Sequence, residues 1–523
     1  MINNILIVGG GSAGWMTAAT LIREFPEKNI SLIESPNIST VGVGESTIGG
    51  IRLWTNWLGI DDKKFLKFTD GSYKLSIKFT DFYKKGEFFH YPFGEPIVEN
   101  NKANLNDWWF KKFFYEDTPY SDYVDCLYPQ MALVNQNKCF YNEDNKIPFD
   151  FKKNTAFHFD ATKFGLWLRE EYCLPRGVKH IKEEILSIEQ DNNGIKSLNN
   201  KYKADLYIDC TGFKSLLLGQ TLKEPFDSYA DLLPNNSAWA TRIPYIDKEK
   251  ELVGYTNCTA IQNGWVWHIP LWSRIGTGYV YSDKFVSDKD ALKEFKEHLM
   301  KIEPYKLIPC DHLEFKNIKM RVGIHKRLWV KNVCAIGLAA GFIEPLESNG
   351  LFSVHEFLML LLRNMKRDQT SQWDKDNFTY QAKLLFRNFA EFVALHYALS
   401  NRNDTEYWRS NLNKNWCENL ITLNPSGVNG LHQAVYRRTH DYHYPTNTGL
   451  HCITAGMHWP PTDLTTAMFL NNKQNLEEYK KEWETYIQQL NLRKMAWNVL
   501  VKNEPSLFEF LKNNIYNENS VNK

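Results

Sequence analysis

The stretch Asn4–Gly14, N-I-L-I-V-G-G-G-S-A-G, decides the fold. It begins with a short apolar run typical of a buried strand, and it leads into the helix-like M-T-A-A-T-L-I. In this G-x-G-x-x-G pattern Gly9 allows a tight turn, Gly11 lets the backbone approach a pyrophosphate, and Gly14 permits close helix–sheet packing. Together with Ser12 and Ala13 these residues predict a dinucleotide site at a helix N-terminus.

Two further segments extend this α/β unit. The strand Ile30–Ile33 ends in Glu34, about 20 residues after the glycines, where an acid is expected to bind a ribose hydroxyl. Farther on, Ala204–Gly219 contains the D-C-T-G sequence that ends at Gly212, which resembles the D-A-T-G segment of flavin monooxygenases. A glycine-rich turn without a ligand is the alternative, but strand, helix and acid in this order favour the dinucleotide.

The composition is that of an ordinary globular protein. The chain has 523 residues, 43% hydrophobic and 24% charged, and its formal net charge is +1. A near-zero charge gives no global field that would favour nucleic acid or an anionic membrane as a partner. The aromatic residues, 17 Trp, 26 Tyr and 32 Phe, are compatible with an aromatic-lined pocket, although a bulky core explains them equally well.

Nine cysteines occur without a C-x-x-C pair or a Cys/His cluster at metal spacing, so we expect free thiols, a reducing compartment and no metal. The N-terminus lacks a basic segment and a cleavage site, and no apolar run reaches the roughly 20 residues that span a bilayer. These features predict a cytoplasmic protein without a membrane segment. Homo-oligomer formation is compatible with them.

Three distant stretches carry candidate chemistry. In Ser72–Phe82 the polar residues alternate with apolar ones, which predicts a strand with Lys74 and Lys78 on one face; a solvated polar face is the simplest interpretation. In Gly264–Pro270, G-W-V-W-H-I-P, Trp265 and Trp267 project from one strand face and form an apolar wall. In Gly341–Phe352, G-F-I-E-P-L-E-S-N-G-L-F, a carboxylate follows a strand of small residues.

These motifs together resemble the flavin-dependent halogenase family, of which W-x-W-x-I-P is a signature. The resemblance implies an FAD-binding Rossmann-like core of the flavin monooxygenase type, with an antiparallel substrate sheet and a C-terminal helical region. It also implies that a separate reductase supplies FADH2, and that the flavin and oxygen convert halide into hypohalous acid. This acid then moves through an interior channel to a small, electron-rich aromatic substrate, for which we favour an indole-type ring.

The resemblance also implies roles for individual residues. Lys78, inside I-K-F, would hold the oxidised halogen covalently or by a hydrogen bond, and Glu347 would orient it or take the ring proton. The channel wall would comprise Trp265, Trp267, Ile269 and Pro270. The halide would lie beside Ser348, Asn349 and Gly350; because the family pattern has S-T-G or S-T-S here, the S-N-G of this chain suggests a preference for bromide or iodide over chloride. Further flavin contacts would come from Gly42, Gly44, Glu45, Ser46, Thr47, Gly337 and Leu338.

The remaining chain predicts how these parts are arranged. We expect a core over residues 1–365, with substrate-side insertions at about 83–150 and 222–320, and a mainly helical region over 366–523. Asp160 is expected to cap a helix, Ser46 or Thr47 to cap another, and His158 to be structural. Tyr442, Tyr444 and His451 are candidates for contacts to a substrate. Two alternatives stay open: a flavin-dependent aromatic hydroxylase, and a flavoprotein without catalytic activity.

Overall fold

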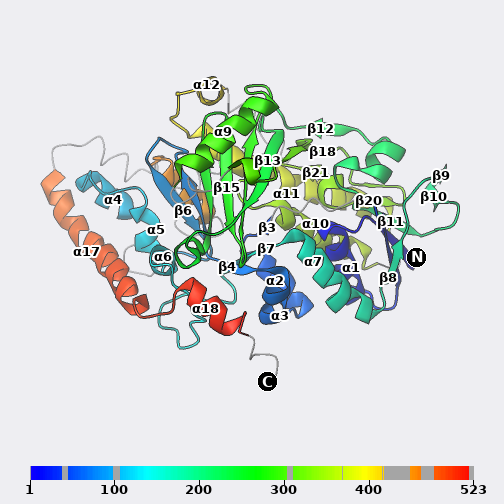
Figure 1. Ribbon diagram of the computed structural model, residues 1–523, viewed down its shortest axis with the longest axis horizontal. Coiled ribbons are helices and arrows are strands. Elements are labelled where there is room, and N and C mark those ends of the chain that lie inside the picture. The colour runs from blue at the N-terminus through cyan, green and yellow to red at the C-terminus, as the bar shows by residue number, and fades with distance from the viewer. Residues whose placement is uncertain are drawn as a thin grey trace.

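A computed structural model describes residues 2–37, 45–97, 107–302, 310–367, 369–414, 416, 448–460 and 476–517. Two large sheets dominate this part of the chain, with helices around them (Figure 1). Smaller sheets join β3 (Glu45–Ser46), β7 (Ala156–Phe159) and β4 (Ser72–Lys74); β12 (Phe226–Ser228), β18 (Gly323–His325) and β21 (Gly341–Phe342); and β9 (Ile188–Asp191) with β10 (Gly194–Leu198).

The first sheet is the predicted dinucleotide unit. Its described strands follow the order β19 (Trp329–Val330), β20 (Val333–Ala335), β11 (Leu206–Asp209), β1 (Asn4–Val8), β2 (Asn29–Glu34) and β8 (Lys179–Lys182). Strand β1 is central and pairs in parallel with β2 and β11, and α1 (Ser12–Glu24) follows it directly. This parallel order places the ends of β1, β2 and β11 at one edge, where nucleotides bind in such folds. The predicted α/β core is thus confirmed.

The second sheet lies beside it and is mostly antiparallel, as predicted. Its described strands follow the order β17 (Lys316–Lys319), β13 (Ser237–Ile243), β16 (Ile275–Tyr281), β15 (Gly264–Pro270), β14 (Tyr255–Ala260), β5 (Ser76–Thr80) and β6 (Phe88–Pro92). Only the β14–β5 pair runs parallel within this described sheet, and it places β5 one strand away from the Trp-containing β15.

Helices cover both sheets (Figure 1). The central ones are α10 (Gly350–Met365) and α11 (Gln372–Ala398), which pack on each other; α10 also packs on α1, and α11 on β19 of the dinucleotide sheet. The long α17 (Leu476–Val501) packs on α4 (Asp107–Phe114), α5 (Asp122–Leu127) and α6 (Met131–Asn135) at the opposite end of the molecule. The other described α-helices are α2 (Ile51–Leu58), α3 (Asp62–Thr69), α7 (Ala161–Trp167), α8 (Lys248–Glu251), α9 (Asp288–Lys301), α12 (Glu406–Leu412), α15 (Thr448–Gly456) and α18 (Leu507–Asn514).

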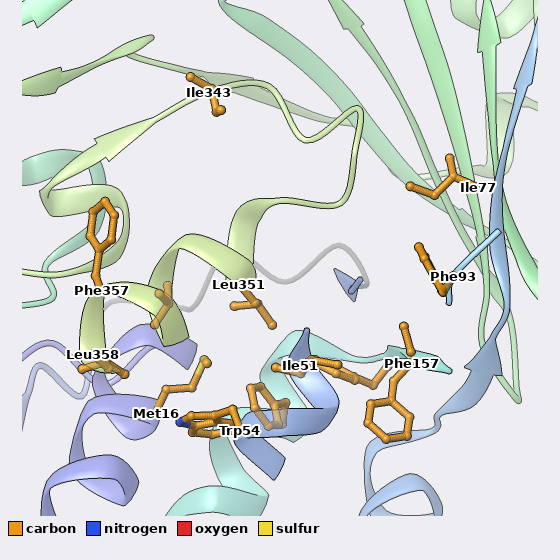
Figure 2. Packing of buried hydrophobic residues seen from close by; sticks show 14 of the residues in the cluster. Met16, Ile51, Trp54, Ile77, Phe93, Phe157, Ile343, Leu351, Phe357 and Leu358 are labelled. Carbon is orange, nitrogen blue, oxygen red and sulfur yellow. The ribbon is translucent and has the colours of Figure 1, made fainter. Parts of the chain in front are cut away.

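One continuous apolar core joins the two sheets and the helices between them. Figure 2 shows Met16, Trp54 and Leu358 close together where α1, α2 and α10 meet, while Ile77 and Phe93 enter the same interior from the second sheet. Because this core is shared, the nucleotide edge and the second sheet are held in one fixed relation. The boundary at about residue 365 stays a prediction.

Several local expectations need correction. The 72–82 stretch is two strands, because β4 pairs with β7 while β5 pairs with β14 and β6. Neither Ser46 nor Thr47 caps a helix; Gly50 precedes α2, and the Thr47 hydroxyl donates to the Phe157 carbonyl instead. Asp160, in contrast, caps α7 by accepting from the Lys163 amide, as predicted.

Among the described residues no helix is long and apolar enough to cross a membrane. The eight described cysteines are buried free thiols.

Candidate functional site

The glycine turn after β1 opens onto a cavity. Gly9 has a φ of 110°, and a Cβ atom on Gly14 would lie 1.9 Å from the Gly9 carbonyl oxygen, so both positions require glycine. A Cβ on Gly11 would meet nothing within 4 Å, which leaves this position open to a ligand. Gly11 also precedes α1 without a side-chain cap. The first amides of α1 and its dipole are therefore available to phosphates.

The cavity measures about 600 Å³, within the usual range for cofactor sites. It extends from this turn to the Trp-containing strand and to the start of α10. Of the residues predicted to contact a cofactor, those that line it are Gly9, Gly11, Ser12, Ala13, Glu34, Glu45, Ser46, Gly212, Gly337 and Leu338. Gly14 serves the predicted packing role, Thr47 is buried away from the lining, and Gly42 and Gly44 lie outside the described residues. The cradle at Gly11 and the elongated lining fit FAD.

Two acids of the lining differ in environment. Glu34 ends β2 and lies 2.7 Å from His180 Nε2 and 3.5 Å from an Arg169 guanidinium nitrogen. Burial, with a smaller contribution from Asp160, raises the pKa of Glu45 to about 7. Glu34 thus stays a candidate for the ribose, and Glu45 is a carboxyl group that can hold or release a proton near neutral pH.

The predicted Trp wall forms one side of the cavity. Trp265 and Trp267 have ring centroids 6.2 Å apart, and both line the cavity together with Ile269; Pro270 is buried behind them. Trp265 Nε1 donates a 2.7 Å hydrogen bond to Glu344 Oε2. The same oxygen accepts from Tyr397 and Asn235, whose donors lie 2.7 and 2.9 Å away. Glu344 therefore fixes the indole plane of Trp265.

The loop that begins at Glu344 places Glu347 in a buried position. Its side chain is 1% exposed, and His396 Nε2 lies 3.0 Å from Glu347 Oε1. Burial raises the pKa of the Glu347 carboxyl group, while His396 and Lys74 oppose this shift. Neither Glu347 Oε1 nor Oε2 has a hydrogen-bond partner among the described residues. A buried carboxylate with an open oxygen is suited to accept a proton.

The structure brings Lys74, and not Lys78, to this carboxylate. Lys74 is completely buried, and its Nζ donates to Ser348 Oγ at 2.8 Å and to the Thr47 carbonyl at 2.9 Å. Burial lowers the pKa of Lys74 to about 7, against the opposing effects of Cys258 and Glu347. The predicted alternation that placed both lysines on one solvated face is therefore wrong for Lys74.

Lys78 lies on the other face of β5. Its Nζ lies over the Phe88 ring at 4.2 Å and farther from the Tyr255 ring. Burial, with a smaller contribution from Lys78, lowers the pKa of His90. The neighbouring Phe79 points the opposite way, with its ring 4.6 Å from the His396 ring. The structure therefore does not bring Lys78 and Glu347 together, contrary to the sequence prediction.

The reason is an interruption at Leu75, which lies between β4 and β5. Leu75 packs near Gly254 and Leu507, and Ser76 bonds His90 on the face of Lys78. In β4 the side chain that points into the interior is Lys74, whereas in β5 the side chains that do so are Ile77 and Phe79. A one-residue slip in a strand reverses every later side chain, and a pattern of strict alternation cannot reveal it.

The predicted halide residues meet at the start of α10. Ser348, Asn349 and Gly350 all line the cavity. Ser348 adopts a φ of 56°, and its hydroxyl accepts from Lys74 and donates to Ser46 Oγ at 3.1 Å. Asn349 is 3% exposed, and its Oδ1 has no hydrogen-bond partner among the described residues. The helix N-terminus and the Asn349 amide together offer donors to an anion.

Hydrogen bonds continue from Ser46 to Thr256, which also lines the cavity, and on to His158. Ser46 Oγ lies 2.6 Å from Thr256 Oγ1, which lies 2.9 Å from His158 Nε2. His158 is completely buried and also lies within reach of Ser72. These partners agree with the structural role predicted for His158. Its hydrogen bonds help to hold the residues that contact Lys74 and Ser348.

Sequence reasoning did not find Lys74, His396 or Glu344 as site residues. Glu344 and Glu347 form an E-P-L-E pair within an apolar segment, and a second acid in such a segment was the available signal. His396 lies within the helical pattern of α11 and carries no local signal. Of the candidates for substrate contacts, His451 is buried in α15, whereas Tyr442 and Tyr444 lie outside the described residues.

Comparison with known proteins places these features in context. A family model described as tryptophan halogenase matches residues 4–445. Tryptophan 6-halogenase ThaL of Streptomyces albogriseolus is 30% identical over 503 residues, 89% of this chain and 91% of that protein. Tryptophan 7-halogenase RebH of Lentzea aerocolonigenes is 32% identical over 432 residues, 78% of this chain and 79% of that protein.

Solved structures agree over almost the whole chain. The structure of apo VirX1 has a TM-score of 0.89 and 38% identity, and the match covers 99% of this chain and 100% of that one. The crystal structure of tryptophan 6-halogenase SttH from Streptomyces toxytricini has a TM-score of 0.80 and 29% identity, with 98% and 99% coverage. The likeness therefore continues past residue 360, where the sequence motifs end.

Proposed function

Because the chain belongs to the flavin-dependent tryptophan halogenase family, we propose that it halogenates an electron-rich aromatic ring at a site formed by Lys74 and Glu347. The observation that carries this proposal is the burial of both side chains beside Ser348, which also lines the cavity suited to FAD. When bound, the reduced flavin supplies the two electrons that, with O2, halide and a proton, give hypohalous acid and water.

In this proposal Lys74 holds the hypohalous acid. Its Nζ donates to Ser348 Oγ and to the Thr47 carbonyl, and no third partner occurs among the described residues. An ammonium group has three donors, so one remains for the oxygen of the acid. Because burial lowers the pKa of Lys74 to about 7, this third proton can be gained or lost near neutral pH.

Glu347 then takes the ring proton. When the ring carbon bonds the halogen, the carbon–hydrogen bond breaks, its electron pair returns to the ring, and the proton moves to a Glu347 carboxylate oxygen. The open Oε2 is the available acceptor. Hydroxide leaves from the hypohalous acid and is protonated by Lys74, so the atoms and charges balance.

The wall residues separate the flavin from the substrate. Trp265, Trp267 and Ile269 line the cavity, and Trp265 is held by Glu344. Hypohalous acid is a small, diffusible oxidant, so an apolar, water-excluding wall limits its loss. We propose that the acid passes inside this wall to Lys74.

We further propose a preference for bromide or iodide over chloride. The Ser348 hydroxyl is engaged by Lys74 and Ser46, which leaves the Asn349 amide and the α10 N-terminus as donors to the halide. An amide reaches farther than a hydroxyl and is less suited to a small, strongly hydrated anion. Competition between chloride, bromide and iodide tests this, and Asn349→Thr should move the preference toward chloride; a wild-type preference for chloride would contradict it.

The substrate proposed is a free indole-type compound, and the reduced flavin is proposed to come from a separate reductase. The relatives named as tryptophan 6- and 7-halogenases differ in the ring position, so the position is not carried over. The test is mass spectrometry of an indole and phenol panel incubated with FAD, a flavin reductase, NADH and each halide. Halogenated product that requires halide and reductase is expected; a hydroxylated product, or none with any panel member, would contradict the proposal.

A further inference from the structure

A histidine lies directly behind the proposed proton acceptor. His396 belongs to the last turns of α11, its side chain is fully buried, and its Nε2 lies 3.0 Å from Glu347 Oε1. We propose that His396 is a positioning residue that holds a proton against Glu347 and so keeps this carboxylate ready to accept the ring proton. This inference rests on the proposed function and adds the residue on which proton acceptance depends.

The other ring nitrogen fixes where that proton lies. His396 Nδ1 is 3.2 Å from the Val393 carbonyl oxygen, which can only accept. Nδ1 therefore carries a hydrogen, and Nε2 of a neutral ring would face Glu347 with a lone pair. Two lone pairs 3.0 Å apart repel each other, so one of the two groups must carry a proton. Either the ring is an imidazolium beside a carboxylate, or Glu347 is protonated.

The position of His396 in the helix favours the imidazolium. It is two residues from Ala398, the last residue of α11, where the helix dipole favours a positive charge. The rings of Phe79 and Phe392 pack on the histidine, with centroids 4.6 and 6.0 Å from the His396 ring. Because both side chains are buried, an ion pair here has no water to replace either partner, so each group depends on the other.

Other titratable groups face the pair from every side. These are Lys74 of β4, Tyr91 of β6, Cys258 of β14, Cys452 of α15 and, on the side of the Trp wall, Glu344. Lys74 favours an ionised Glu347, whereas Glu344 favours a protonated His396. Lys74 and a protonated His396 thus both stabilise the ionised form of Glu347. Of these two cations, His396 is the one that contacts Glu347 directly.

The first experiment measures the pH dependence of kcat, with indole and bromide as the probes. His396→Gln retains an amide that can donate to Glu347 but cannot carry the positive charge. The acid limb of kcat should move upward by about one pH unit, a roughly tenfold loss of rate below the limb, with KM unchanged. His355→Gln is the matched control, since His355 is also buried and lies 3.3 Å from Glu356; its profile should match that of the wild type.

The second experiment does not depend on catalysis. In protein labelled with ¹⁵N-histidine, both ring nitrogens of His396 should be protonated near pH 7.5, and Glu347→Gln should convert the ring to its neutral form. A neutral His396 in the wild type, or an unchanged pH profile in His396→Gln, would overturn the inference. If the wild type halogenates nothing, the proposed function fails, while the ¹⁵N signals still decide the state of this pair.

Discussion

Two lysines four residues apart occupy two different regions of the molecule. Lys74 ends β4, is completely buried, and contacts the loop that carries Glu347. Lys78 lies in the middle of β5 on the opposite face, is partly exposed, and lies over the Phe88 ring. The two lysines belong to one alternating sequence pattern, but their side chains lie in chemically different surroundings. The difference teaches that the site depends on the interruption at Leu75 and not on the I-K-F segment.

The largest expected effect comes from the carboxylate on the Lys74 side. Glu347→Gln should lower the rate of halogenation by at least 100-fold, because an amide cannot accept the ring proton. FAD binding should persist, since Glu347 does not line the flavin cavity. Product formation and flavin fluorescence measure these two properties.

The matching change on the Lys78 side is His90→Asn, which keeps a polar group facing Ser76. It should leave the rate within a few-fold of the wild type. If His90→Asn lowered the rate as much as Glu347→Gln, the Lys74 side and the Lys78 side would not differ in their importance for the reaction.

The second-largest expected effect is a change in the free energy of unfolding with pH. Because burial lowers the pKa of Lys74 to about 7, the unfolded chain binds more protons than the folded one between pH 7 and the unfolded pKa of about 10.4. The stability of the wild type should therefore rise with pH over this window. Relative to Lys74→Met, the wild type should gain about 2 kcal/mol between pH 7 and pH 9 in urea unfolding.

Lys78→Met provides the comparison for this measurement. Burial lowers the pKa of Lys78 as well, but its side chain is partly exposed, so the gain over the same window should be smaller. Equal gains for the two variants would show that both lysines experience the same environment.

The smallest expected effect is the loss of stability when one contact of each ammonium group is removed. Ser348→Ala removes one acceptor of Lys74 and should cost about 1 kcal/mol in stability. Phe88→Leu removes the ring beneath Lys78 and should cost about 0.5 kcal/mol at this partly exposed site. Thermal unfolding of the two variants measures this, and the order would be reversed if Lys78 were the more constrained lysine.

The same contrast explains what the sequence could predict. The turn at Gly9–Gly14, strand β1, the antiparallel sheet and the Trp265–Trp267 wall follow from local spacing, and the structure agrees with each. Glu347 was proposed because its contiguous motif resembles that of the family. These features are encoded within a few neighbouring residues.

The remaining site features depend on contacts between distant segments. The inward orientation of Lys74 depends on β4 and β5 pairing with different strands, which no local alternation specifies. His396 reaches Glu347 from α11, almost 50 residues farther along the chain, and shows no signal in its own segment. Such placements follow from tertiary packing, so the sequence pattern could not separate Lys74 from Lys78, and the choice of Lys78 depended on the family resemblance alone.

The most direct test is a side-by-side assay of Lys74→Ala and Lys78→Ala with reduced FAD, bromide and indole, with brominated product measured per flavin oxidised. Lys74→Ala should form at least 100-fold less product while it still oxidises flavin, and Lys78→Ala should stay within a few-fold of the wild type. Full activity in Lys74→Ala, or its loss only in Lys78→Ala, would contradict the assignment of the buried lysine to the reaction.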